Sequence, residues 1–384
     1  MVNMTERMKQ SASFKTGREK EACCGCAACA AVCPVGAVQM VIDEEGFWYP
    51  EINPSRCTGC GRCEAVCPLG RERAGYGGRT CFGAQAREET IRMGSSSGGM
   101  FPVLAEYVLR RQGAVFGAAF SESMEVVHRE ARSLEELEAL KKTKYVQSRM
   151  DGVYRRIETL LREGTWVLFC GTPCQAYGLK RFLGRDYPRL LLVDLVCYGA
   201  PSPGLWRDYT ARLERRYGPL TAFSFRDKRG RDHGHTRAYI AGGQEHACQL
   251  SRDPYCGMYF ANLSIRPSCH VCEFSSPDRE SDFTLGDFWG VEKVRPEADD
   301  GMGISLVLLH TDKAREIWRE VQGQLDCFPC EEEAALQPRL RGPTPPSPYR
   351  GLFMRIYRTL PAGTLFFLWE KKETAAGLWR RLRP

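Results

Sequence analysis

The chain has 384 residues, of which 43% are hydrophobic and 26% are charged, and its net charge is +7. This composition is typical of a globular protein, and the length gives room for two or three domains with proper cores. No apolar run is long enough to span a bilayer, and the first 22 residues lack the apolar core of a signal peptide. The basic residues are scattered and form no recognition motif, so nucleic acid is not an expected partner.

After a polar leader over residues 1–22, one cysteine pattern occurs twice. The pattern Cys-x2-Cys-x2-Cys-x3-Cys-Pro fills residues 23–34 and again residues 57–68. It matches the bacterial run for 4Fe–4S clusters, in which three close thiolates bind one cube and the cysteine before proline binds the other cube. We therefore predict two clusters, with cluster I held by Cys23, Cys26, Cys29 and Cys67, and cluster II held by Cys57, Cys60, Cys63 and Cys33.

A zinc site and a disulfide framework both fit these eight cysteines less well. Zinc usually takes four cysteines as two distant CxxC pairs, not eight in two tight runs with a trailing proline. A disulfide framework would require an oxidising compartment, which nothing in the sequence indicates. Because low-potential clusters favour reducing conditions, we expect a cytoplasmic protein.

Downstream of the cysteine runs the pattern changes to alternating strands and helices. Within the ferredoxin-type domain (23–78) a hairpin is expected over residues 38–48, turning at 43–46. A linker rich in glycine and arginine, residues 70–80, marks the boundary of this domain. Helices are expected at 101–113, 133–142, 153–164, 174–184 and 312–325, and strands at 114–120, 125–131, 166–170, 190–197 and 305–310.

This order predicts an α+β (mixed α/β) fold, in which a small dicluster domain precedes a larger α/β domain with a mixed sheet. The larger domain is expected over residues 79–340, with halves at 79–158 and 159–340. Residues 341–384 are expected to form a helical extension that is apolar and basic near its end. We favour packing of this extension on its own domain over docking on a membrane or a partner.

Four segments of the larger domain carry residues suited to chemistry. Residues 95–102 read SSSGGMFP before a helix, an arrangement that suits a phosphate, although serine caps and Gly-Gly turns are common. FCGTPCQ (169–175) and CYGAPSP (197–203) each follow an apolar strand, where functional residues gather in such sheets. RPSCHVC (266–272) contains a CxxC that alone could be a zinc site, redox-active or neither.

In their order, these segments resemble the beta-subunit family of coenzyme F-420 hydrogenases and dehydrogenases, which is also similar to plant 7-hydroxymethyl chlorophyll a reductase. The matching pieces, from about residue 80 to 310, are SSSGG, TKYVQS, GTPCQ, VCYGAPSP, FRDK, RPSCHVCEF and SDFTLGDFWG. Members of that family bind FAD with a 4Fe–4S cluster beside it. The resemblance implies that a third cluster is held by Cys174, Cys197, Cys269 and Cys272.

From the residues alone other ligands stay open. Cys170, or the pair Cys327 and Cys330, could be a ligand or a dithiol instead, although we expect the pair to be unliganded because it lies outside the matched region. The cysteines expected to be structural thiols are Cys24, Cys81, Cys248 and Cys256.

The resemblance also implies a flavin site. It assigns the flavin phosphate to Ser97, Gly98 and Gly99, and it sets Lys144, Tyr145, Gln147 and Ser148 near the flavin. A lysine near the N1–C2=O edge would stabilise a reduced anionic flavin. Arg226 and Lys228 are alternatives for that role or for an acidic substrate. No catalytic residue is assigned, and the loop histidines His233 and His235 are expected to be solvated.

The leading hypothesis is an iron–sulfur flavoprotein oxidoreductase, a ferredoxin- or F-420-linked dehydrogenase or reductase. It would pass electrons between ferredoxin-type 4Fe–4S clusters and FAD, with hydride transfer to or from a partner such as coenzyme F-420. The alternative is an electron-transfer subunit of a larger redox complex with no small substrate of its own. Expected partners are a redox protein such as ferredoxin and a small redox substrate or coenzyme; self-association is left open.

Overall fold

The computed structural model describes residues 20–71, 78–361 and 363–371. In the small domain, helices α2 (Ala28–Val32) and α3 (Arg62–Ala65) each begin inside one cysteine run. Strands β1 (Val38–Ile42) and β2 (Trp48–Ile52) form the expected antiparallel hairpin between the runs. Most of the predicted leader (1–19) and residues 72–77 of the linker lie outside the described residues. No helix in the described ranges has the length and apolar character needed to cross a bilayer.

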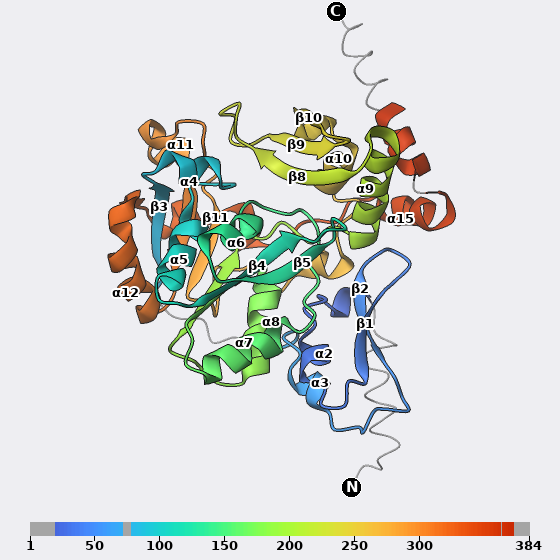
Figure 1. The fold of residues 1–384 in the computed structure, drawn as a ribbon, viewed down its shortest axis with the longest axis horizontal. Coiled ribbons are helices and arrows are strands. Elements are labelled where there is room, and N and C mark those ends of the chain that lie inside the picture. The colour runs from blue at the N-terminus through green and yellow to red at the C-terminus, as the bar shows by residue number, and fades with distance from the viewer. Residues whose placement is uncertain (1–19, 72–77, 362, 372–384) are drawn as a thin grey trace, which may run out of the picture.

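An eight-stranded mixed sheet organises the larger domain, with the strand order β13-β3-β12-β11-β7-β6-β4-β5 (Figure 1). The four strands β11, β7, β6 and β4 run parallel, and the pairs toward both edges are antiparallel. The mixed sheet predicted from the sequence is therefore confirmed. The strand bounds are β3 (Thr80–Ala86), β4 (Ala114–Phe120), β5 (Val126–Ala131), β6 (Val167–Gly171), β7 (Leu190–Leu195), β11 (Phe283–Asp287), β12 (Ser305–Leu309) and β13 (Leu325–Pro329).

Successive residues of the central strands point to opposite faces, so the sheet separates two hydrophobic cores. Val115 and Leu168 pack in the core that contains α5 (Met100–Leu109) and α12 (Asp312–Val321). Their chain neighbours Phe116 and Phe169 pack in the core that contains α7 (Val153–Arg162) and α8 (Pro173–Leu183). Figure 1 shows these helices on the two faces of the sheet.

The dicluster domain is packed against the larger domain. Cys26, Ala28 and Cys33 belong to the same buried core as Tyr154 of α7 and Leu179 of α8. A hydrophobic core that is continuous across the two domains requires that they are held together, because separating them would expose its apolar surface to water.

A second, three-stranded antiparallel sheet, in the order β10-β9-β8, was not expected from the sequence. It consists of β8 (Leu220–Asp227), β9 (Thr236–Ala241) and β10 (Gln244–Gln249), and it lies beside α9 (Pro203–Tyr217), α10 (Pro254–Phe260) and α15 (Arg350–Thr359) (Figure 1). Phe353 of α15 and Phe366 are buried in its core, so this part of the extension packs on its own domain as expected. Leu378 and Trp379 lie outside the described residues. The remaining short helices are α4 (Glu89–Met93), α6 (Leu134–Leu137), α11 (Val291–Val294), α13 (Glu332–Ala335) and α14 (Pro338–Arg341).

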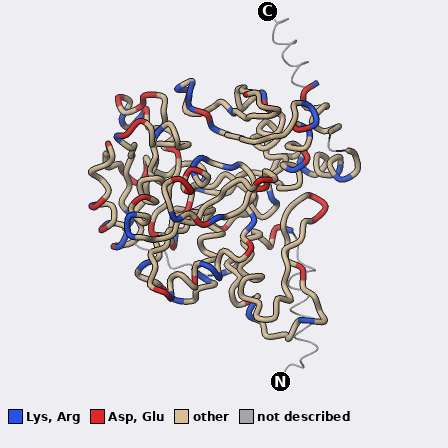
Figure 2. The backbone as a smooth tube through the Cα atoms, in the orientation of Figure 1, with Lys and Arg blue, Asp and Glu red and all other residues tan. Residues whose placement is uncertain are grey.

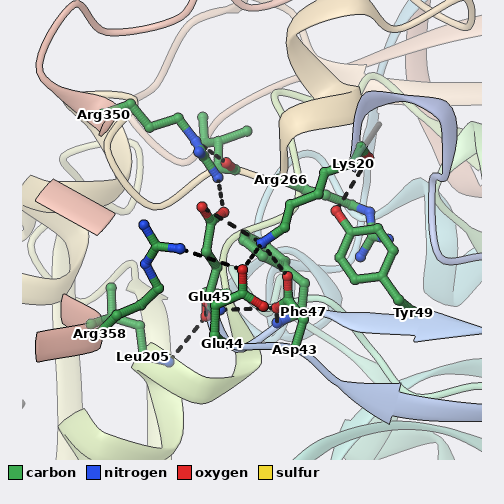
Figure 3. Close-up of polar contacts among 12 residues, drawn as sticks. Lys20, Asp43, Glu44, Glu45, Phe47, Tyr49, Leu205, Arg266, Arg350 and Arg358 are labelled. Carbon is green, nitrogen blue, oxygen red and sulfur yellow. Dashed lines mark hydrogen bonds and ion pairs between the residues drawn. The ribbon is translucent and has the colours of Figure 1, made fainter. Parts of the chain in front are cut away.

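The turn of the small domain's hairpin (43–47) is acidic and is anchored on α9 and α15. Figure 2 shows acidic residues at this turn facing basic residues of α15, and Figure 3 shows the contacts. Arg350 pairs with Glu45 at 2.7 Å, and Lys20 pairs with both Asp43 and Glu44 at 2.7 Å. The buried hydroxyl of Ser202, at the start of α9, donates to the Glu45 carbonyl at 2.7 Å. These polar contacts fix the hairpin's orientation on the larger domain.

Candidate functional site

The four cysteines predicted for cluster II line one hollow. Cys33, Cys57, Cys60 and Cys63 all border a cavity of about 340 Å³ in the small domain. Cys33 comes from the first cysteine run and the other three from the second, which is the crossover that the pattern predicts. Burial by itself would raise the pKa of the Cys33 thiol. Hydrogen bonds from the backbone N–H groups of Val38 and its neighbours outweigh this effect, so the pKa of Cys33 is lowered. A thiol that is easily deprotonated suits a cluster ligand.

The two cysteine runs repeat their backbone conformation as well as their sequence. Gly25 (φ +69°) and Gly59 (φ +67°) have equivalent positions in the two runs, and so do Ala27 (φ 64°) and Gly61 (φ 71°). All four residues are left-handed, a conformation that glycine adopts at little cost. Three of the four residues are glycine for this reason, and α2 and α3 both begin directly after such a residue. Of the cysteines predicted for cluster I, Cys26 and Cys29 are buried and Cys23 and Cys67 are half-buried, and the assignment stays a prediction.

The four cysteines predicted for the third cluster come from three separate segments and converge. Cys174 lies in the first turn of α8, Cys197 follows β7, and Cys269 and Cys272 lie in and after the turn 267–271. Cys197 interacts electrostatically with the other three, and Cys174 also interacts with both Cys269 and Cys272.

The four cysteines of this third set are only partly exposed to water. A hydrogen bond with Cys24, together with burial, raises the pKa of Cys174, and burial raises the pKa of Cys269 to about 12. Such thiols remain neutral unless a metal centre takes the proton's place. No group of three His, Cys, Asp or Glu among the described residues is tight enough to hold a single metal ion. A 4Fe–4S cube is larger than one ion and is bound by thiolates at its corners, so four converging, partly buried cysteines fit it.

The rival ligands lie elsewhere. Cys170 interacts with Asp194 and Lys144, and burial raises its pKa to about 12. Cys327 packs in the core with α12, whereas Cys330 packs in a core on the other side with Cys81. Cys327 lies in β13 and Cys330 follows it, and because the two cysteines pack in different cores they do not form a dithiol pair in this structure.

The residues predicted to contact the flavin phosphate lie at the start of α5. Gly99 has φ +94° and caps this ten-residue helix without a side-chain hydrogen bond, which leaves first-turn N–H groups free to bind an anion. Gly98 lies so close to β3 that a Cβ there would stand 2.2 Å from the Ala84 carbonyl oxygen. The buried Lys228 amine donates to the carbonyls of Arg92 and Ser97, so it lies against the turn of residues 95–99 that precedes α5.

Lys228 and Arg226 lie in a cluster of charged groups beside this turn. Burial, with help from the neighbouring Arg226 guanidinium, lowers the pKa of Lys228 to about 7. Arg226 pairs with Asp287, and its guanidinium lies 5.8 Å from the ring centre of the exposed Trp289. His233, which faces Asp299 at 3.6 Å, donates no bond to this group, but its carbonyl accepts from Arg226.

The predicted residues of TKYVQS (143–148) divide between different surroundings. The backbone N–H of Thr143 donates to Ser96 Oγ at 2.7 Å, which ties this segment to the phosphate turn. Tyr145 packs against Phe225 in the core of the three-stranded sheet. At the other end of the segment, Gln147 Nε2 donates to the carbonyls of Cys24 and Gly25 at 3.4 Å. The Gln147 side chain therefore lies against the loop of residues 23–27, which we call the cluster I loop.

Lys144 and Ser148 lie near Cys170. Burial lowers the pKa of Lys144 to about 7, with Cys170 among its neighbours. Ser148 bonds to His128 Nδ1 at 2.9 Å, and His128 Nε2 bonds to the Cys170 carbonyl at 3.1 Å. A carbonyl only accepts, so Nε2 carries the proton and Nδ1 accepts from the serine. Burial keeps this imidazole neutral by lowering the pKa of His128 to about 4.

The sequence analysis assigned no individual role to several residues at these sites. The buried Gln175 donates to Ser148 at 2.9 Å, and the buried Arg92 pairs with Asp300 at 2.6 Å beside Lys228. A second hollow of about 270 Å³, between α8 and residues 274–281, is bordered by the buried pair Asp194 and Arg279. Each contact joins residues far apart in the chain, and no local pattern reports such pairs.

The two repeated cysteine runs are those of an iron–sulfur protein, and the larger domain has a mixed α/β architecture. Residues 22–70 match a 4Fe–4S dicluster domain, and residues 164–332 match the family described as the C terminus of the coenzyme F420 hydrogenase/dehydrogenase beta subunit. The resemblance inferred from the motifs is therefore confirmed: the chain joins a stretch that matches the dicluster domain to a stretch that matches that family.

Among solved structures, the chain is similar to one from the F420-reducing [NiFe] hydrogenase complex of Methanosarcina barkeri. The identity is 17% and the TM-score 0.45, over 79% of this chain and 94% of the other. A comparison with curated proteins found no match.

Proposed function

We propose that the chain is an iron–sulfur flavoprotein oxidoreductase that transfers electrons between a one-electron carrier protein, such as ferredoxin, and a hydride-exchanging partner. The partner would be coenzyme F-420 or another small redox coenzyme. When bound, the clusters would supply one-electron steps and FAD would link these to two-electron hydride chemistry. The chain's own part is to hold these groups in a row, away from water.

The observation that carries this proposal is that residues 143–147 contact both the phosphate turn and the cluster I loop. Thr143 is bonded to the phosphate turn through Ser96, and Gln147 is bonded to the cluster I loop through Cys24 and Gly25. Four residue steps span at most about 14 Å, so the two anchored positions lie within that distance of each other. The third cysteine set adjoins the same loop, because Cys24 also contacts Cys174. The proposed cofactor sites are therefore neighbours.

We also propose a role for each set of residues. Cys23, Cys26, Cys29 and Cys67 would hold cluster I; Cys57, Cys60, Cys63 and Cys33 would hold cluster II; Cys174, Cys197, Cys269 and Cys272 would hold the third cluster. Gly98, Gly99 and the amine of Lys228 would bind the flavin's phosphates at the α5 N-terminus. Lys144, next to Cys170, is our candidate for the amine near the flavin ring. Cys60 is exposed, which suits the entry point for electrons from a carrier protein.

The domain division proposed from the sequence is kept, with one qualification. Residues 23–78 would be the dicluster domain, 79–340 the flavin domain and 341–384 a helical extension. The halves 79–158 and 159–340 both contribute strands to the eight-stranded sheet, so they are parts of one folding unit.

A second candidate function is an electron-transfer subunit without a small substrate of its own. It is favoured by the match to a family described as a beta subunit, since a subunit acts with other chains. The two candidates differ in what happens after reduction of the flavin: the subunit would pass electrons only to another protein.

The test is anaerobic purification with quantification of iron and flavin, followed by rapid mixing with reduced ferredoxin. We expect bound FAD to bleach, and reoxidation by one of NAD(P)⁺ or a deazaflavin. Cys60→Ala should slow the bleaching at least about a hundredfold while FAD stays bound, whereas Cys248→Ala, in β10, should leave the rate unchanged. A chain without flavin would overturn the proposal, and FAD that bleaches but reduces no small acceptor would favour the subunit.

A further inference from the structure

Arg266 differs from every other buried arginine of the described chain. Five arginines are buried, and four of them pair with an aspartate: Arg92 with Asp300, Arg226 with Asp287, Arg237 with Asp253 and Arg279 with Asp194. Arg266 is fully buried, at 0% exposure, and within the described residues no carboxylate comes within ion-pair distance of it. Its Nη2 has no hydrogen-bond partner there either.

The nearby carboxylates are already neutralised by other cations. Figure 3 shows the acidic turn with Lys20, Arg350 and Arg358 directed at it and with Arg266 to one side, next to Tyr49. Lys20 pairs with Asp43, and Arg350 pairs with Glu45. The acidic turn is therefore not the counter-charge of Arg266.

The contacts that Arg266 does make come from the cluster segments. Its Nε donates to the Cys23 carbonyl at 2.8 Å, and its Nη1 donates to Gln147 Oε1 at 3.1 Å. Its backbone N–H donates to the Ala200 carbonyl at 2.9 Å, and its own carbonyl accepts from the Cys269 N–H at 3.0 Å. The residue thus joins the cluster I loop to the Cys197 and Cys269 segments.

The ionisable groups that act most strongly on the guanidinium are thiols and a phenol. Its ionisable neighbours are Cys23, Tyr49, Cys24 and Cys269, and the guanidinium lies 4.0 Å from the centre of the Tyr49 ring. A cation over an aromatic ring regains part of the lost hydration, but a buried charge normally requires an opposite charge as well. Thiolates bound in an iron–sulfur cluster carry negative charge, and they are the anionic groups that this environment can supply.

Gly25 provides the space that the guanidinium fills. A Cβ at this position would stand 2.9 Å from Arg266 Nη1 and 2.3 Å from Gln147 Nε2, and the residue has φ +69°. Glycine in the cluster I loop thus lets the cation approach that loop closely.

We propose that Arg266 is a positioning residue shared by cluster I and the third cluster, where its buried positive charge raises the reduction potentials of both. This assignment rests on the proposed function, because it requires that both cysteine sets hold clusters. A fixed cation favours the reduced, more negative state of each cluster, and the low dielectric of the interior strengthens this effect.

The test is a redox titration followed by electron paramagnetic resonance on the anaerobic holoprotein and on three variants. In Arg266→Gln the potentials of cluster I and the third cluster should both fall by about 59 mV or more, a tenfold change in the ratio of reduced to oxidised form. Cluster II should not shift, because its cysteines do not adjoin Arg266. Arg266→Lys keeps the charge, so the ratio of reduced to oxidised form of each cluster should stay within about threefold of the wild-type value. Arg237→Gln breaks a buried pair in the second sheet, so it should leave all three potentials unchanged.

Each result decides the assignment. Arg266→Gln with full iron and unchanged potentials would overturn it, and the proposed function would survive if iron and flavin content were as expected. If Arg266→Gln loses iron, Arg266→Lys decides between two roles. Clusters that are retained at near wild-type potentials in Arg266→Lys support the assignment. Loss of iron in Arg266→Lys as well would mean that Arg266 only stabilises the fold. A wild-type chain that lacks the third cluster would instead contradict the proposed function.

Discussion

Gly178 of α8 lies directly against Cys26 of the dicluster domain. A Cβ on Gly178 would stand 3.1 Å from the Cys26 sulfur. Cys174 precedes Gly178 by one helical turn on the same face, and it contacts Cys24. One face of α8 therefore touches the cluster I loop at two points, and the second point is a proposed ligand of the third cluster. The close packing of this helix sets the spacing between the two sites.

Replacing Gly178 should weaken this contact. In a helix, Gly→Ala normally stabilises by up to about 1 kcal/mol, and that gain is expected for Gly351→Ala in α15, where a Cβ would meet nothing within 4 Å. In Gly178→Ala the added methyl group must displace Cys26 or Tyr154, so we expect a lower melting temperature and a loss of iron. Anaerobic thermal unfolding and iron assays of both variants measure this. Equal stabilisation by the two substitutions would show that α8 is not closely packed on the loop.

Ser202→Ala should cost about twice as much as an ordinary cap deletion. Ser202 Oγ accepts from the Leu205 N–H at 3.1 Å, capping α9, and it donates to the Glu45 carbonyl at 2.7 Å. Loss of a cap costs about 1 kcal/mol, and an unpaired buried carbonyl adds about 1 kcal/mol. The matched control is Ser133→Ala, which removes an exposed cap of α6 and nothing else. Comparable melting shifts for the two variants would exclude a role of Ser202 in holding the hairpin.

The affinity for FAD should fall as the pH rises. The pKa of Lys228 in the ligand-free chain is about 7, and bound phosphates would raise it because they favour the charged amine. Binding then takes up a proton, so affinity is highest below pH 7 and declines as the pH rises through 7 toward the pKa of the bound form. Fluorescence titrations from pH 6 to 9 should show this decline, flattened in Lys228→Met and retained in the exposed-site control Lys293→Met. If the wild-type affinity for FAD does not depend on pH, Lys228 does not contact the phosphates.

The parts of the fold that were predictable are those with strong local patterns. Strand β4 lies at residues 114–120, as the sequence indicates, because a buried central strand is continuously apolar. The sheet β8–β10 was missed because β10 (QEHACQ) is polar and half-exposed. The turn between β1 and β2 was found through its Asp and Gly residues, whose conformational preferences are local.

For the candidate site, motif spacing identified thiols but not their surroundings. The family resemblance set Gln147 near the flavin with the rest of TKYVQS, and the structure adds a contact that the motif does not report, because its side chain reaches the loop of Cys24 and Gly25. Arg266 was quoted only as part of a motif. Its significance is a missing counter-charge, which depends on what every other segment brings near it, so a linear pattern cannot report it.

The most direct test of the account is the iron content of the anaerobically purified chain. Three cubes predict about twelve irons per chain, falling to about eight in Cys197→Ser with the dicluster signals intact. Cys170→Ser, which changes the rival cysteine near Lys144, should keep about twelve. A wild-type content of about eight irons, or equal losses in Cys197→Ser and Cys170→Ser, would contradict the third cluster and with it the row of sites from Cys60 to the α5 N-terminus.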